Sequence, residues 1–161
     1  MKSKKILLYI VFLGSLLLDQ LTKFLVDSKM MLGESKEIIP GFFNITYVRN
    51  TGAAWSIMEG KMYFFYAVSI IAIVVLVAFY KNLSKWDMIN RVAILLMISG
   101  TIGNLIDRLA FNYVRDFLDF IIFNYDFPVF NIADCALVIG VGIIILNEFL
   151  DSLGVKKYGR K

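Results

Sequence analysis

The chain has 161 residues, of which 59% are hydrophobic, and its mean hydropathy is +0.72. Soluble domains are usually only about 45–50% apolar, so this composition indicates an integral membrane protein. The absence of histidine and the presence of a single cysteine exclude Ser–His or Cys–His catalysis and an internal disulfide framework. In a membrane protein the net charge of +4 does not indicate nucleic-acid binding, and we expect none.

Four segments are apolar enough to cross a bilayer, which requires roughly 20 mostly apolar residues. We predict membrane helices over about residues 6–26, 62–80, 89–109 and 129–150, forming one membrane-embedded domain that spans residues 1–161. The alternative for the first segment is a cleaved signal peptide. It is not favoured, because no small-residue cleavage site follows and the apolar pattern continues beyond Leu18.

The polar interval after the first helix is expected to contain β structure. Residues 36–58 are rich in β-branched and aromatic side chains, and Pro40 and Gly41 interrupt them. Such a composition predicts a strand or hairpin. Asn50 and Gly52 then open a stretch of small residues in which glycine permits close backbone approach, with an ordinary turn as the alternative.

Several polar or small residues lie within the predicted helices. Asp19 and Lys23 are four residues apart and therefore share a helix face, although a snorkelling lysine beside an interfacial aspartate is the alternative. Gly100 and Gly103 are spaced as helix-packing residues. Asn104 needs a buried partner, and either joins two helices or orients a carboxylate.

The distribution of Lys and Arg predicts the orientation. The basic N-terminus, the basic loop over residues 81–91 and the basic C-terminal tail would all be cytoplasmic, so both termini would be inside. The intervals 27–61 and 110–128 would then face outward. Four acidic residues fall at one depth near the outer surface in this arrangement: Asp19, Asp107, Asp116 and Asp134.

Two of these acids suggest chemistry. We expect Asp134 about two helical turns inside the fourth helix, where an ionisable residue is a functional-site hypothesis, and Asp116 in the outer loop before it. Two neighbouring carboxylates share one proton, so the ionised one can activate water while the other polarises a carbonyl. This chemistry needs no metal and no cofactor. Asp119 competes with Asp116 for the role, but we expect it to cap or to face solvent.

Two other classes of function fit the sequence less well. A small transporter or proton-relay protein would place some acidic residues near the membrane midplane, whereas these gather at one surface. A Ser/Lys peptidase would use Lys23 as its base. No serine is a convincing nucleophile for it, since Ser15 lies deeper on the same helix and Ser28 lies beyond its end.

Five blocks of this sequence resemble, in order and over nearly the whole chain, those of the lipoprotein signal peptidases (signal peptidase II). The blocks are Asp19–Lys23 (DQLTK), Arg49–Trp55 (RNTGAAW), Gly103–Arg108 (GNLIDR), Val114–Asp119 (VRDFLD) and Phe127–Asp134 (FPVFNIAD).

The resemblance implies a four-helix membrane protein with a small extracytoplasmic β-cradle, in the bacterial cytoplasmic (inner) membrane, with its active site near the outer surface. It implies an aspartic endopeptidase that cuts prolipoproteins before a diacylglyceryl-modified cysteine. Membrane lipids and globomycin-type inhibitors are the other implied partners. The family's catalytic pair maps onto Asp116 and Asp134. Its supporting positions map onto Asp19, Lys23, Asn50, Gly52, Asn104, Asp107, Arg108, Asn131 and Ala133.

This chain departs from the family pattern in two places. Arg115 stands where the family usually has an apolar residue, and we expect it to alter head-group or substrate preference. Ser99 and Thr101 replace small residues before the Gly-Asn block. Neither departure is expected to touch the catalytic pair.

Overall fold

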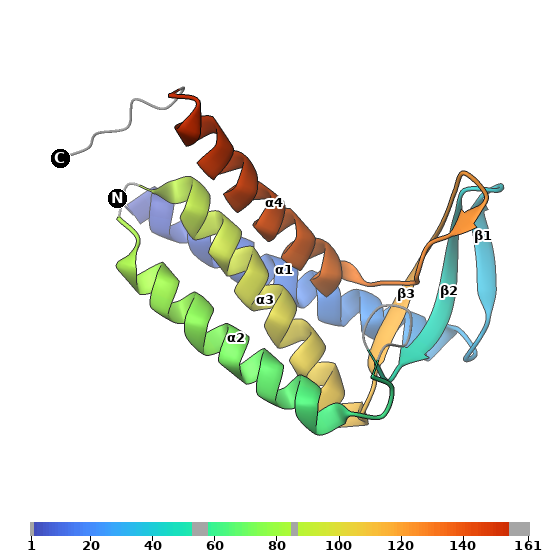
Figure 1. Cartoon of the computed structure of the whole chain (residues 1–161). Helices are drawn as coiled ribbons and strands as arrows, with labels where there is room; N and C mark the ends of the chain where they lie inside the picture. The colour runs from blue at the N-terminus through green and yellow to red at the C-terminus, as the bar shows by residue number, and fades with distance from the viewer. Residues whose placement is uncertain (1, 53–57, 85–86, 155–161) are drawn as a thin grey trace.

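The computed structural model describes residues 2–52, 58–84 and 87–154. The remainder of the Arg49–Trp55 block, Lys85 and the basic tail after residue 154 lie outside the described residues. The four helices of the described residues form a bundle, and Figure 1 shows a small sheet at one end of it. The helices are α1 (Lys2–Lys29), α2 (Met62–Asn82), α3 (Met88–Phe111) and α4 (Ile132–Ser152), and the strands are β1 (Ser35–Ile39), β2 (Phe43–Asn50), β3 (Val114–Ile122) and β4 (Tyr125–Asp126).

All four helices are long and apolar enough to cross a membrane, which confirms the predicted fold class. Helix α3 is the centre of the bundle and packs against the other three. Glycine makes this contact close: a Cβ added at Gly100 would lie 2.3 Å from the carbonyl oxygen of Ala133, and one at Gly140 would lie 2.6 Å from that of Ala93. The predicted packing role of Gly100 is therefore confirmed.

The sheet is antiparallel in the order β1-β2-β3-β4. The expectation that Asp116 lies in a loop is wrong, because residues 114–122 form β3 and pair with β2, with Val48 opposite Asp116 and Arg49 opposite Arg115. The physical reason is that β2 satisfies the backbone groups of this segment, whose apolar residues are β-branched or aromatic apart from Leu118. Its three charged residues interrupt the apolar pattern by which a strand is predicted from the sequence.

A small core fixes the sheet to the end of α1. Val26 packs with Tyr47 and Phe117, and the Tyr47 hydroxyl donates a hydrogen bond to the carboxylate of Asp27. Burial, together with Asp27, raises the pKa of Tyr47 to about 12, so the hydroxyl keeps the proton that it donates. Because β2 is anchored to α1 and β3 follows α3 directly, the sheet has a defined position over the helix ends.

Candidate active site

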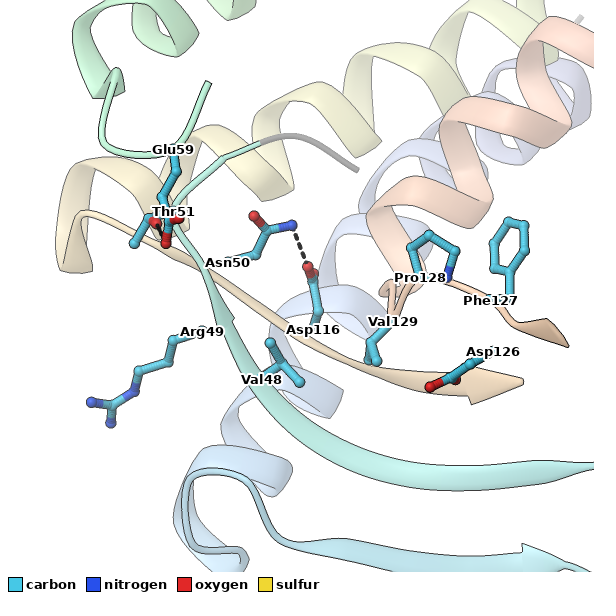
Figure 2. Close-up of a pocket in the computed structure, with 10 residues that line it drawn as sticks. All are labelled: Val48, Arg49, Asn50, Thr51, Glu59, Asp116, Asp126, Phe127, Pro128 and Val129. Carbon is cyan, nitrogen blue, oxygen red and sulfur yellow. Dashed lines mark hydrogen bonds between the residues drawn. The ribbon is translucent and has the colours of Figure 1, made fainter. Parts of the chain in front are cut away.

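Asp116 is held by two asparagine side chains. It is only 2% exposed, and its Oδ1 accepts from Asn131 Nδ2 at 2.6 Å while its Oδ2 accepts from Asn50 Nδ2 at 2.9 Å. The second contact is visible in Figure 2. The amide N–H of Gly52 donates to Asn50 Oδ1 at 2.9 Å, which turns the NH₂ group of Asn50 toward the carboxylate.

Asp134 lies in the first turn of α4, so the prediction that it sits two turns inside the helix is wrong. The helix starts later than expected because Asn131 caps it. Asn131 Oδ1 accepts from the Asp134 amide at 3.0 Å, and Asp134 Oδ2 accepts from the Asn131 amide at 3.1 Å. This reciprocal arrangement is a capping box, which satisfies amide groups at a helix start.

Asn104 and Asn131 connect the two carboxylates. Asn104 Nδ2 donates to Asp134 Oδ1 at 2.7 Å, and Asn131 Nδ2, which also binds Asp116, lies 3.1 Å from Asn104 Oδ1. Asn131 is fully buried. The structure supports both predicted roles for Asn104, which orients the carboxylate of Asp134 and joins α3 to α4 and, through Lys23, to α1.

The environment of Asp116 favours its protonated form. Burial, and then the nearby charge of Asp134, raise the pKa of Asp116 from 3.8 to about 7, although hydrogen bonds from Asn50 and Asn131 oppose the change. An acid with such a pKa can keep a proton at neutral pH and release it during a reaction.

Lys23 and Asp19 form a second layer beneath the asparagines. Lys23 Nζ donates to Asp19 Oδ2 and to Asn104 Oδ1, each at 3.0 Å, and the lysine side chain is fully buried. The snorkelling alternative is therefore wrong. Asp19 Oδ1 accepts from the Ala133 amide at 2.9 Å. Because the first amides of a helix have no partner within it, this bond fixes the start of α4 next to Asp134.

Asp107 and Arg115 form the other buried pair of this layer. The guanidinium donates to both carboxylate oxygens of Asp107, from Nε at 3.0 Å and from Nη2 at 2.8 Å, and the Arg115 amide adds a third bond at 3.0 Å. Burial disfavours the charge on Arg115, but the bonds to Asp107 outweigh it and raise the pKa of Arg115. Arg115 is 5% exposed, so it is a buried partner of Asp107, and its expected effect on head-group or substrate preference stays a prediction.

Arg108 and Asp119 have other contacts than the buried pairs described above. The Arg108 guanidinium lies over the ring of Phe65 at 4.9 Å, and its Nε has no hydrogen-bond partner among the described residues. Asp119 is three residues beyond Asp116 on the same strand and so points to the opposite face. It is buried and accepts from Thr46 Oγ1, so the expectation that it caps or faces solvent is wrong.

Sequence reasoning missed Gln20 as a member of this network. Its Nε2 donates to Asp19 Oδ2 at 2.9 Å and to the Gly103 carbonyl at 3.1 Å. The signal was present, because an uncharged amide in a membrane helix needs a partner. Ser99 and Thr101 stay outside the network: Ser99 pairs with Ser15 across α1 and α3, and Thr101 bonds to the Met97 carbonyl of its own helix.

A pocket of about 250 Å³ opens over Asp116. Figure 2 shows that it runs from the end of β2, at Asn50 and Thr51, to the segment of residues 126–129 that precedes α4. The pocket is large enough for a short stretch of extended peptide. Among the described residues, no three His, Cys, Asp or Glu side chains are grouped so that they could hold a metal ion.

Comparison with known proteins identifies the family. The family model described as signal peptidase (SPase) II matches residues 11–150. The chain belongs to the signal peptidase II family. Its relatives include the lipoprotein signal peptidase of Staphylococcus haemolyticus (strain JCSC1435), which is 50% identical over 89% of this chain and 90% of the relative. That of Staphylococcus aureus (strain bovine RF122 / ET3-1) is 47% identical over 86% and 85%.

Solved structures agree with this assignment to signal peptidase II. A bacterial membrane enzyme solved at 2.3 Å has a TM-score of 0.87 and 42% identity, covering 96% of this chain and 94% of that one. A second, solved at 1.9 Å, has a TM-score of 0.80 and 44% identity over 87% and 90%. As a signal peptidase II with four membrane-spanning helices, this chain is a peptidase of the bacterial cell membrane.

Proposed function

We propose that this protein is an aspartic endopeptidase that removes the signal peptide from diacylglyceryl-modified prolipoproteins and cuts just before the lipidated cysteine. The observation that carries the proposal is the pair Asp116 and Asp134, joined through Asn104 and Asn131 at the mouth of the helix bundle. The names of the relatives, lipoprotein signal peptidases, support the substrate class.

In the mechanism, the pair holds one proton in the resting enzyme. Asp116 carries it, consistent with its pKa of about 7, while the start of α4 and two N–H donors stabilise a negative charge on Asp134. Asp134 takes a proton from water as the water oxygen attacks the scissile carbonyl carbon, and Asp116 gives its proton to the carbonyl oxygen. The product is a neutral tetrahedral diol.

The diol then collapses. Asp134 returns its proton to the amide nitrogen as the carbon–nitrogen bond breaks, and Asp116 recovers a proton from one hydroxyl as the carboxyl group forms. Both carboxyl groups regain their starting states, so no metal or cofactor is consumed. In the proposal, this pair is supported by the surrounding residues, which are Asp19, Lys23, Asn50, Gly52, Asn104, Asp107, Arg108, Asn131 and Ala133.

The substrate is placed by the membrane. Helices α1, α3 and α4 converge beneath the pair, and the pocket over Asp116 lies on the sheet side, outside the spans. A signal peptide and acyl chains in the bilayer would bring the scissile bond to this depth, while the chain after the cysteine leaves through the pocket. Acyl chains add about 0.8 kcal/mol of membrane affinity per buried methylene. Globomycin-type inhibitors would compete for the same position.

The orientation is part of the proposal. The start of α1 and the end of α4 lie at the end of the bundle away from the sheet (Figure 1). With basic segments on the cytoplasmic side, both termini lie on the cytoplasmic side of the membrane and the sheet lies on its outer side. Reporter fusions at Gly41 and Ser84 should therefore report opposite sides, and the same side for both would contradict this orientation.

Cleavage of a synthetic precursor by the purified protein tests the proposal. The diacylglyceryl-modified precursor should be cut before its cysteine, and the unmodified peptide in the same detergent should be cut poorly. Equal rates on the two peptides would reject the lipid requirement. Cleavage at another bond would reject the proposed specificity.

A further inference from the structure

Four buried charges lie under the proposed catalytic pair. Asp19 and Asp107 are the acids, Lys23 and Arg115 are the bases, and none is more than 5% exposed. The two signs therefore balance. Charges removed from water are tolerated when they are paired, and removing one partner leaves the other uncompensated. The balance in this layer consequently depends on Arg115, one of two cations.

The hydrogen-bond distances show which acid each cation binds. Arg115 binds both oxygens of Asp107, at 2.8 and 3.0 Å, whereas Lys23 Nζ is 3.8 Å from Asp107 Oδ2. Lys23 instead donates at 3.0 Å to Asp19 and to Asn104. Asp107 is thus satisfied mainly by the arginine, which leaves the ammonium group available to Asn104.

We propose that Arg115 is a positioning residue for Asp116 and Asp134, and that it acts by neutralising Asp107 so that Lys23 remains bound to Asn104. This inference rests on the proposed function, since it concerns the same pair. Arg115 hydrogen-bonds to Asp107 rather than to either carboxylate of that pair, so its effect passes through Asp107.

One arm of the effect leads to Asp134. Without the guanidinium, Asp107 and Asp19 would compete for a single ammonium group in a buried site. The movement of Lys23 toward Asp107 would remove a donor from Asn104 Oδ1. Asn104 Nδ2 holds Asp134 Oδ1 at 2.7 Å, so the orientation of that carboxylate would no longer be fixed.

The other arm leads to Asp116. Asp107 Oδ2 also accepts from the Arg115 amide at 3.0 Å, which ties the start of β3 to α3 one residue before Asp116. The guanidinium lies over the ring of Phe111, at 4.7 Å from its centroid, which orients it toward Asp107. A shift of Asp107 therefore moves the strand that carries Asp116.

A charge cycle tests the proposal on the full-length enzyme, with rates per folded molecule on the lipidated precursor. Arg115→Met should lower kcat by about 10- to 100-fold, as displacements of up to about 1 Å do, with KM little changed because Arg115 does not line the pocket. Asp107→Asn/Arg115→Met should be faster than Arg115→Met, because the uncompensated carboxylate is gone. Arg115→Lys should be intermediate, since lysine keeps the charge but not the paired bonds.

Arg91→Met is the matched control, because Arg91 lies at the other end of α3 and binds the Leu83 carbonyl. The single variant Asp107→Asn completes the cycle. The proposal is overturned if Arg115→Met keeps kcat within about twofold of the parent, or if the fold-loss of kcat in the double variant equals the product of the fold-losses in Asp107→Asn and Arg115→Met. If Arg115→Met does not fold, a folded double variant no slower than Arg115→Lys supports the proposal, and an inactive one overturns it. An inactive parent rejects the proposed function itself, whereas an active parent with insensitive variants rejects only the positioning role.

Discussion

Substitution of Gly103 tests whether the position of Asp19 controls the site. A Cβ at Gly103 would lie 2.5 Å from Asp19 Oδ2 and 3.2 Å from the Cβ of Ala133. Observed Cβ contacts essentially never fall below 3.0 Å, so the carboxylate or the helix must move by at least about 0.5 Å. Asp19 has little freedom to move, because Lys23, Gln20 and the Ala133 amide all bind it within 3.0 Å.

The magnitude follows from opposing effects. Overpacking a filled interior costs about 1–3 kcal/mol, and weakening a hydrogen bond to a charged group adds about 1.5–3 kcal/mol. Alanine recovers about 1 kcal/mol of helix propensity relative to glycine. We expect Gly103→Ala to lower the free energy of unfolding by about 1.5–5 kcal/mol after this offset. Its kcat should fall about 10- to 100-fold, because Asp19 fixes the start of α4 beside Asp134.

Thermal unfolding in detergent and cleavage rates per folded enzyme measure both effects. Gly142→Ala is the matched control, since no heavy atom of the described residues beyond its own stretch of α4 lies within 4 Å of a Cβ built there. It should leave activity unchanged and stability equal or slightly higher. If Gly103→Ala behaved like Gly142→Ala in both measurements, the close contact between Gly103 and Asp19 would not be functional.

Three further predictions concern pH, metal and a neighbouring acid. Because the pKa of Asp116 rises from 3.8 to about 7 on folding, the folded state binds more protons between these values, so stability should fall as pH rises through this window; the pH dependence of thermal unfolding should be flatter for Asp116→Asn, and an unchanged slope would contradict the assignment. Cleavage should survive EDTA, and Cys135→Ser should remain substantially active; activity lost to chelator and restored by added metal would reject the metal-free mechanism. Asp119→Asn should lower stability by about 1–3 kcal/mol, because it alters a buried acceptor of Thr46, while kcat per folded molecule stays near that of the parent; a large fall in kcat would show that this carboxylate takes part in catalysis.

The sequence was sufficient to predict the four helices and the residue types of the site. The apolar segments have the length of the bilayer, and acids in such segments are rare enough to stand out. The distribution of basic residues predicts that those acids lie near the outer surface of the membrane, and this location remains a prediction.

Long-range pairing could not be predicted from the sequence in the same way. Strand β3 was hidden because Arg115, Asp116 and Asp119 interrupt its apolar pattern, and only pairing with β2 makes the segment extended. The bond between Arg115 and Asp107 exists because β3 folds back onto α3, which no local pattern reports. The position of Asp134 was misjudged because the cap formed by Asn131 sets the start of α4 after the apolar pattern begins.

The central claim is that Asp116 and Asp134 act together as an aspartic pair. Cleavage of the lipidated precursor should be measured for Asp116→Asn, Asp134→Asn, the double variant and Asp119→Asn, with folded enzyme quantified by thermal unfolding. Each single change at the pair should reduce kcat by about 100- to 10,000-fold. The double variant should be scarcely slower than either, because the two groups work as a unit, and Asp119→Asn should remain active. If Asp116→Asn kept most of its activity while Asp119→Asn lost it, the wrong carboxylate of β3 has been assigned, and if both kept it the aspartic mechanism is wrong.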